Sequence, residues 1–272
     1  MDPFRFRFKI FLVVFLIVFV FGTLGFMIIE RRSLIDAFYF SIVTIATVGY
    51  GDVHPVTLPG KILTILMIVT GVGTFLGVVA NATEMLLNKR EKKVRLEKLN
   101  MVIGTFFSEV GRQLLADFSR FDPQLEKIRK TLIITKDWSE QEFIKASKIL
   151  ESYDYAVAIH KYDLEILRSF LFKKRDFLLR LLENPTLLEH ESFTQLLQAV
   201  FHLTDELSYR EDISHLPDTD KAHLAGDIKR SYAMLVQQWL HYMKYLKNNY
   251  PYLFSLAIRT NPFDEKASPI VE

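Results

Sequence analysis

Two long apolar segments lie in the first third of the chain. Twenty residues from Ile10 to Ile29 carry no charge, and Ile62–Leu87 is a second apolar run, polar only at a few threonines, Asn81 and Glu84. A helix of about 20 residues covers about 30 Å, which is the thickness of the hydrocarbon layer of a membrane. A signal peptide would have a shorter apolar region and a small-residue cleavage site, which the residues around Ile29 do not offer. The pattern predicts two membrane-spanning helices, 10–29 and 62–87.

Basic residues flank these two spans unevenly. Three lie before the first span, between Arg5 and Lys9, and three more are spread over the loop 30–61. Six basic residues follow the second span within ten positions: Lys89, Arg90, Lys92, Lys93, Arg95 and Lys98. Because segments rich in lysine and arginine stay in the cytoplasm, we expect a multi-pass protein of the cell membrane with both termini cytoplasmic.

The remainder of the chain has apolar residues at helical spacing. A helix continuing the second span is expected to break near Gly104, and Ser139 with Glu142 forms a capping box that starts another helical stretch. That stretch keeps its helical spacing as far as Pro185. The expected helices cover 89–118, 139–184, 186–210 and 219–249, with a short last helix after Tyr250-Pro251 and a tail over 261–272.

The composition differs between these two parts. The first 88 residues hold 8 of the 11 glycines and 11 charged side chains, whereas the rest holds 28 lysines and arginines and 27 aspartates and glutamates. The formal net charge of +2 argues against a nucleic-acid partner, because such a protein needs a basic excess to neutralise phosphates. The absence of cysteine excludes disulfides, thiolate zinc sites and cysteine nucleophiles.

The loop between the spans carries the most specific motif. Ser33 and Asp36 begin a predicted helix over 33–46, and Thr47-Val48-Gly49-Tyr50-Gly51-Asp52 follows it directly. This run resembles the selectivity filter of potassium channels. The resemblance covers roughly residues 10–88 and is closest to the two-transmembrane pores of prokaryotic calcium-gated potassium channels. A Gly-Tyr-Gly sequence alone more often marks a turn. Between two spans, after a short helix, it is a specific signal.

Potassium conduction explains why a filter needs these residue types. A potassium ion that enters a narrow pore must exchange its hydration shell for protein oxygens, and backbone carbonyls supply them densely. Gly49 and Gly51 can adopt positive φ at little cost, so that successive carbonyls can face one side. The resemblance implies that K⁺ binds along Thr47, Val48, Gly49, Tyr50 and Gly51, and that no other cofactor is needed. One chain supplies a quarter of each oxygen ring, so a homotetramer in membrane lipid is expected.

Residues around the filter are expected to hold its diameter. Val48 and Tyr50 would point away from the ion and pack on the pore helix, and Tyr39 could donate a hydrogen bond to Asp52 behind the filter. Some members of the resembling family have Trp at the position of Tyr39 and Glu at that of Val43, and this sequence departs from the family at both positions.

The second span contains the candidate gate. The resemblance places Gly71 at the family's hinge, where the inner helix bends. Close helix packing is the alternative, because Gly73 and Gly77 form a Gly-x-x-x-Gly pair. Glu84 is the only charged residue of this span and is expected to face water at the inner vestibule. A glutamate that reaches the membrane interface is its alternative.

The sequence thus predicts an all-α membrane protein: two transmembrane helices with a re-entrant pore helix and a selectivity-filter loop, followed by a helical cytoplasmic domain. The expected parts are a pore domain over 1–88, the helical domain over 89–260 and the tail. The expected function is a potassium-selective channel, gated at the inner helices by a cytoplasmic signal. The alternatives are a weakly selective cation channel and a membrane-anchored helical signalling protein with a vestigial pore.

Known regulators and active sites are not evident in residues 89–272. Two spans leave no room for a voltage sensor, and three glycines cannot build the Gly-rich turn of a Rossmann-like calcium-sensing domain. No catalytic triad or phosphate loop is evident, so no enzyme is expected.

Four residues are candidate metal ligands. Asp212 with His215 and Asp220 with His223 would each share a helical face, but Pro217 separates the pairs and the spacing matches no defined ligand pattern. These residues are interpreted as capping or solvated side chains, and His160 and His202 as ordinary helix residues.

Overall fold

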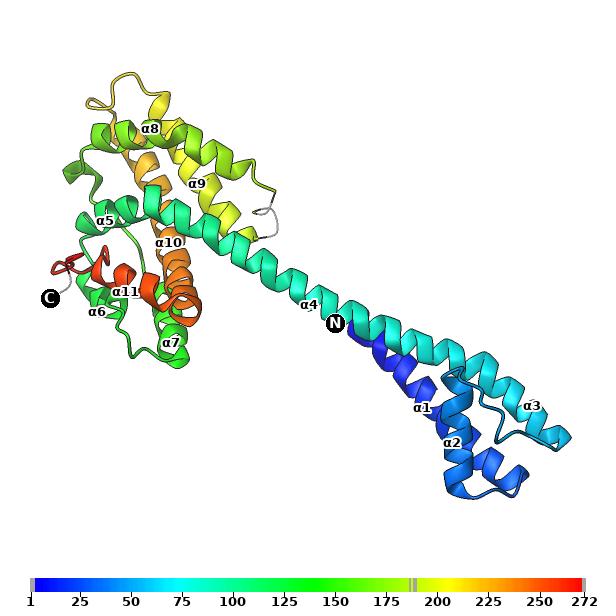
Figure 1. Ribbon diagram of the computed structural model, residues 1–272. Coiled ribbons are helices and arrows are strands. Elements are labelled where there is room, and N and C mark those ends of the chain that lie inside the picture. Colours follow the sequence, from blue (N-terminus) through cyan, green and yellow to red (C-terminus); the bar gives the residue numbers. More distant parts are fainter. Residues whose placement is uncertain (1–2, 186, 188–189, 271–272) are drawn as a thin grey trace. The chain divides into compact units, whose positions relative to one another are not determined.

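The computed structural model describes residues 3–185, 187 and 190–270. Every regular element in these residues is a helix (Figure 1), which confirms the expected fold class. The chain divides into two compact units, Met1–Val94 and Arg95–Glu272. Two of its helical runs are long and apolar enough to cross a membrane, Arg5–Ile29 and the run that begins at Leu58.

The first unit is built from two long helices and a short one. Its helices are α1 (Pro3–Ile29), α2 (Leu34–Ile45), α3 (Leu58–Met67), a π-helical turn (Ile68–Val72) and the first part of α4 (Gly73–Phe106). The helices begin earlier than the predicted spans. The Thr57 hydroxyl accepts a hydrogen bond from Gly60 N at 3.1 Å and so caps α3. α4 runs on through the basic segment because lysine, arginine and glutamate are good helix formers.

The core of this unit joins α1 to α2 and α3. The rings of Phe26 and Phe40 stack with centroids 3.9 Å apart. Beside them, the Thr23 hydroxyl donates to the Ser41 hydroxyl at 2.9 Å, which in turn donates to the carbonyl of Ala37. Met67 fills the space over Gly22, where a Cβ would lie 2.7 Å from its methyl carbon. These contacts fix α2 against α1, and therefore fix the point at which the following loop begins.

The second unit is a helical bundle with the long α10 at its centre (Figure 1). Its elements after α4 are a π-helical turn (Phe107–Gly111), α5 (Arg112–Arg120), α6 (Glu126–Leu132), α7 (Glu140–Glu151), a 3₁₀ turn (Ile159–Lys161), α8 (Leu164–Leu182), α9 (Glu191–Ser208), α10 (Asp218–Asn249) and α11 (Pro251–Arg259). α10 contacts α5, α7, α9 and α11, and α8 lies beside α9. Tyr232, Leu235 and Trp239 of α10 are buried in the core.

The break expected near Gly104 takes the form of a π-helical turn: α4 runs through Gly104 to Phe106, and the turn Phe107–Gly111 joins it to α5. The predicted stretch that begins at Ser139 is wrong, because it is not one continuous helix. Its capping box is present, but α7 ends at Glu151, and Asp163 accepts hydrogen bonds from the first amides of α8. Tyr153, which continues the helical spacing in the sequence, instead lies in a loop, and its hydroxyl donates to Asp122 Oδ2 at 2.8 Å.

The segment interpreted as a tail also differs from expectation at its start. The Asn261 side chain is buried and donates to the carbonyl of Leu132 at 2.8 Å. Phe263 is 2% exposed, and its ring packs edge-on against Trp239 with centroids 5.0 Å apart. The two prolines of this segment stop a helix but do not prevent its apolar residue from joining the core.

Candidate ion-conduction site

The loop after α2 is held by hydrogen bonds from one side. The amides of three successive residues donate back to the last turn of α2: Thr47 N to the carbonyl of Thr44 at 3.1 Å, and Val48 N and Gly49 N to that of Val43 at 2.9 and 3.3 Å. The loop amides thus donate to carbonyls in the last turn of α2 that have no partner within the helix. The carbonyls of the loop are thereby left to point elsewhere.

The sign of φ alternates along the loop after α2. The φ angles of Thr47, Gly49 and Gly51 are positive, at 61°, 61° and 78°, whereas Val48 and Tyr50 between them have negative φ. In a regular strand every second carbonyl points the opposite way. Residues with positive φ at alternate positions allow successive carbonyls to face one side.

Contrary to the expectation from the sequence, Val48 and Tyr50 do not pack on α2 within one subunit. The side chains of Val48 and Tyr50 are 51% and 72% exposed rather than packed on the pore helix. A cavity of about 380 Å³ lies behind the loop, with a wall formed by α2 and the start of the second span. Its lining includes Tyr39, Val43 and Thr64. The rest of the subunit therefore leaves both side chains largely uncovered.

The expected hydrogen bond behind the filter is present. The Tyr39 hydroxyl donates to Asp52 Oδ2 at 2.8 Å, and Asp52 Oδ1 accepts from Val53 N at 3.0 Å. His54 Nδ1 lies 3.2 Å from the carbonyl oxygen of Gly51. The Gly51 oxygen thus has a hydrogen-bond partner within the subunit when this ring nitrogen carries its proton.

A second clamp, which the sequence did not reveal, holds the chain as it returns to the membrane. Glu30, the first residue beyond α1, accepts hydrogen bonds from Val56 N at 3.1 Å, Thr57 N at 3.0 Å and the Thr57 hydroxyl at 2.7 Å. Gly60 allows this approach, because a Cβ there would collide with Glu30 Oε1. The Thr57 hydroxyl is the main cause that lowers the pKa of Glu30 below its ordinary value.

Gly71 combines the features of a hinge and of a packing glycine. It lies inside the π-helical turn and is buried, and a Cβ there would be 2.9 Å from Ile45 Cγ1 at the end of α2. The Thr74 hydroxyl bonds the carbonyls of Thr70 and Gly71 at 2.8 and 3.0 Å. A π turn is a weak point in a helix, and such a hydroxyl satisfies backbone groups that the turn releases.

Gly73, Gly77 and Glu84 lie along one side of α4. Gly77 packs directly on Phe11 of α1, whereas Gly73 has no atom within 4 Å of the position its Cβ would take. Glu84 is exposed and follows Gly77 by seven residues, which is about two helical turns. These positions therefore do not divide α4 into a packed face and an open one.

Of the two Asp–His pairs that the sequence singled out, one forms. Asp212 and His215 are bonded to each other at 2.9 Å on the surface. Asp220 instead accepts two hydrogen bonds of 2.7 Å from Arg210. His223 Nε2 lies 3.6 Å from an oxygen of Glu206 and 3.5 Å from one of Asp227.

Two family models match the chain. Residues 13–88 match the ion channel family, and residues 95–259 match the family described as uncharacterized protein MJ1433, C-terminal helical domain. No solved structure matches the chain.

Individual relatives include an uncharacterized protein and potassium channels. The uncharacterized protein MJ1433 of Methanocaldococcus jannaschii is 51% identical over 189 residues, which are 70% of this chain and 76% of the relative. Two-pore potassium channel 4 of Arabidopsis thaliana is 44% identical over 71 residues, 26% of this chain and 25% of that protein. Probable potassium channel protein 2 of M. jannaschii is 39% identical over 79 residues, 29% of this chain and 23% of that protein.

The two family matches meet at the boundary between the two units of the structure. The first unit carries an ion channel pore domain that is related to potassium channels over about a quarter of their length. The second unit matches a family model over more than half of the chain, and the relative with that name is similar over most of its own length. The chain belongs to the MJ1433 family, whose C-terminal helical domain follows an ion channel pore domain here.

Proposed function

We propose that this protein is a potassium-selective channel that conducts K⁺ passively through a pore shared by four copies of the chain. The observation that carries the proposal is the alternating φ of residues 47, 49 and 51, with the loop amides bonded to α2. Four such loops around an axis surround an ion with rings of carbonyl oxygens from residues 47–50, and the Thr47 hydroxyl adds a further ring. Tyr39 and Asp52 support the loop from behind.

The surface of the single subunit favours a tetramer. Tyr50 is 72% exposed in a segment that lies between two membrane spans, and the cavity behind the loop is lined by apolar and aromatic side chains. A neighbouring copy can cover both. The C-terminal end of α2 carries a partial negative charge that favours a cation below the filter. Both termini lie in the cytoplasm in this arrangement.

The gate of the proposed channel lies in the second span. Gly71 sits in the π-helical turn, where α3 passes into α4, so that bending there moves the cytoplasmic half of the inner helix. Glu84, which is exposed, lies at the inner vestibule of the proposed channel, where four carboxylates concentrate cations. The second unit transmits the signal that biases this gate.

Replacing Gly49 tests the filter directly. We expect Gly49→Ala to abolish K⁺ flux, because an alanine with φ of 61° is strained by roughly 1–2 kcal/mol and the peptide relaxes by turning its carbonyl away. Flux into liposomes and K⁺/Na⁺ reversal potentials in bilayers are measured on purified protein. Gly226→Ala is the matched control, because its φ is ordinary and no atom lies near the added methyl group.

The measurements separate the proposal from its rivals. Wild-type reversal potentials near that of Na⁺ would indicate a weakly selective cation pore. No rubidium flux through intact wild-type tetramers, at several pH values and ligand conditions, would favour the membrane-anchored signalling protein. Normal K⁺ current from Gly49→Ala would contradict the filter assignment itself.

A further inference from the structure

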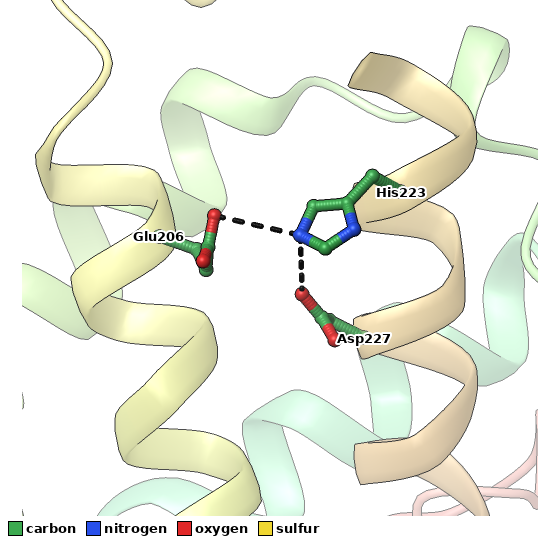
Figure 2. Close-up of side chains that lie close together, drawn as sticks. All are labelled: Glu206, His223 and Asp227. Carbon is green, nitrogen blue, oxygen red and sulfur yellow. Dashed lines mark ion pairs between the residues drawn. The ribbon is translucent and has the colours of Figure 1, made fainter. Parts of the chain in front are cut away.

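Two histidines and two carboxylates converge between α9 and α10, in the unit that the pore does not use. α9 contributes His202 and Glu206, and α10 contributes His223 and Asp227, each pair one helical turn apart. His223 Nε2 lies 3.6 Å from Glu206 Oε2 and 3.5 Å from Asp227 Oδ2 (Figure 2). His202 Nε2 lies 3.7 Å from Glu206 Oε1 and 3.6 Å from Asp227 Oδ2.

Hydrogen bonding does not explain this arrangement. All four separations exceed the 2.7–3.2 Å of an N–H···O bond. His223 Nε2 carries at most one proton, yet it lies midway between two carboxylates from different helices, as Figure 2 shows. Asp227 is 4% exposed, and its Oδ2 is a buried atom with no hydrogen-bond donor. A buried carboxylate oxygen without a donor carries a desolvation penalty that a bound cation would remove.

The separations fit two ligands of one metal ion. Zinc binds histidine nitrogen at about 2.0–2.1 Å and carboxylate oxygen at about 2.0–2.2 Å, so neighbouring ligand atoms of a tetrahedral site lie roughly 3.3–3.5 Å apart. The distances from His223 Nε2 to the two oxygens, 3.6 and 3.5 Å, need only a small contraction. The three ligand atoms of Glu206, His223 and Asp227 all lie within 4.8 Å of one another.

We propose that Glu206, His223 and Asp227 bind a divalent transition-metal ion of the zinc class, which joins α9 to α10. Imidazole and carboxylate suit such ions, and no cysteine is needed. Three protein ligands leave a fourth position for water. His202 is a positioning residue that approaches the same two carboxylates from α9. The His223 side chain is 54% exposed, so the ion can enter from solvent.

Two arginines contact the carboxylates of this site without occupying the position proposed for the metal ion. Arg210 donates to Glu206 Oε2 at 2.8 Å and to Asp220, and its hydrogen bond lowers the pKa of Glu206, which keeps this ligand ionised. The second lone pair of that oxygen stays available to a metal. Arg230 reaches the other oxygen of Asp227, Oδ1, at 3.5 Å from an exposed position. Outer residues that contact metal ligands in this way help to orient them.

Zinc binding by the full-length protein tests the site. The purified protein in detergent, stripped of metal and of any affinity tag, is dialysed against Zn²⁺, and bound metal per chain is measured by atomic emission. We expect one zinc per chain, a melting temperature raised by about 5–10 °C at a hundredfold excess over Kd, and tetrahedral absorption bands when Co²⁺ replaces Zn²⁺.

Variants assign the ligands. We expect His223→Gln and Asp227→Asn to abolish stoichiometric binding, and His202→Gln to weaken it about tenfold. His215→Gln is the matched control, because His215 also pairs with an aspartate but lies outside the cluster. Circular dichroism checks that each variant is folded, and His223 is exposed enough for glutamine to be tolerated. Wild-type protein without bound zinc, or folded His223→Gln that binds as wild type does, would overturn the proposal.

Discussion

Thr47 holds a backbone conformation that threonine rarely adopts. Its φ is 61°, and a β-branched residue there is a genuine outlier that costs on the order of 1–3 kcal/mol. Glycine would remove the strain, as it does at positions 49 and 51. A threonine that keeps the strained conformation supplies a hydroxyl oxygen beside its carbonyl, and this is what the proposed innermost ion site needs. The hydrogen bond from its amide to Thr44 helps to hold it.

Glu30 is the residue whose charge we expect to matter most for the stability of the pore unit. Its carboxylate accepts three hydrogen bonds from Val56 and Thr57, and these bonds weaken when Gln replaces it. We expect Glu30→Gln to lower the melting temperature of the purified protein at neutral pH. Glu183→Gln, at an exposed position in the second unit, is the control and should melt as wild type does.

The pH dependence of this effect has a definite sign. Hydrogen bonds, first from the Thr57 hydroxyl, lower the folded pKa of Glu30 below its ordinary 4.5. The stabilisation by the ionised Glu30 carboxylate is therefore complete above pH 4.5. It is lost as the pH falls through the lowered pKa of the folded state. The difference in melting temperature between wild type and Glu30→Gln should shrink over that acidic range. A constant difference would show that shape, not charge, holds this loop.

At the scale of elements, the π-helical turn that we propose as the hinge of the gate packs against the end of α2. Gly71 packs against Ile45 with no room for a methyl group, so Gly71→Ala affects both the bend and the contact. We expect Gly71→Ala to reduce the open probability in bilayer recordings. The double variant Gly71→Ala with Ile45→Ala removes the colliding atoms, and we expect it to stay impaired if bending is the cause. Recovery of wild-type gating in the double variant would assign Gly71 to packing, with Ile45→Ala alone as the control.

Local sequence signals predicted the elements well where they act over a few residues. Ser33 and Ser139 cap helices as expected, because a cap depends on amides three positions away. The positive φ of Gly49 and Gly51 also follows from their lack of a Cβ, whereas that of Thr47 does not follow from its residue type. By contrast, the loop after α7 has apolar residues at helical spacing, and only tertiary packing decides that Tyr153 leaves the helix.

Contacts between distant residues could not be predicted from the sequence. Glu30 and Thr57 are 27 positions apart, and neither forms a motif alone. The cluster of His223, Glu206 and Asp227 needs the register of α9 on α10, which no local pattern specifies. Asp212 and His215 pair as their spacing suggests. Asp220 and His223 have partners that their spacing does not predict, Arg210 for the first and Glu206 and Asp227 for the second.

At the scale of the whole molecule, one helix belongs to both units. α4 extends from Gly73 to Phe106, and the boundary between the units falls after Val94. The segment around this boundary is charged and makes few contributions to either core, whereas Leu99 and Ile103 beyond it are buried in the second unit. Any signal from the second unit to the proposed gate at Gly71 has a covalent route through this helix.

Interrupting α4 at the boundary tests that route in the full-length protein. We expect insertion of Gly-Gly-Ser-Gly after Val94 to leave tetramers intact by size-exclusion chromatography, because the pore unit has its own core and its own filter. The open probability should shift toward that of a chain ending near Arg95, since glycine costs about 1 kcal/mol per residue in a helix and uncouples its two ends. The same insertion after Asp212, in the loop between α9 and α10, is the control and should leave gating unchanged. Loss of tetramers after the insertion at Val94 would instead make the second unit an assembly device, and gating identical to wild type would show that α4 transmits nothing.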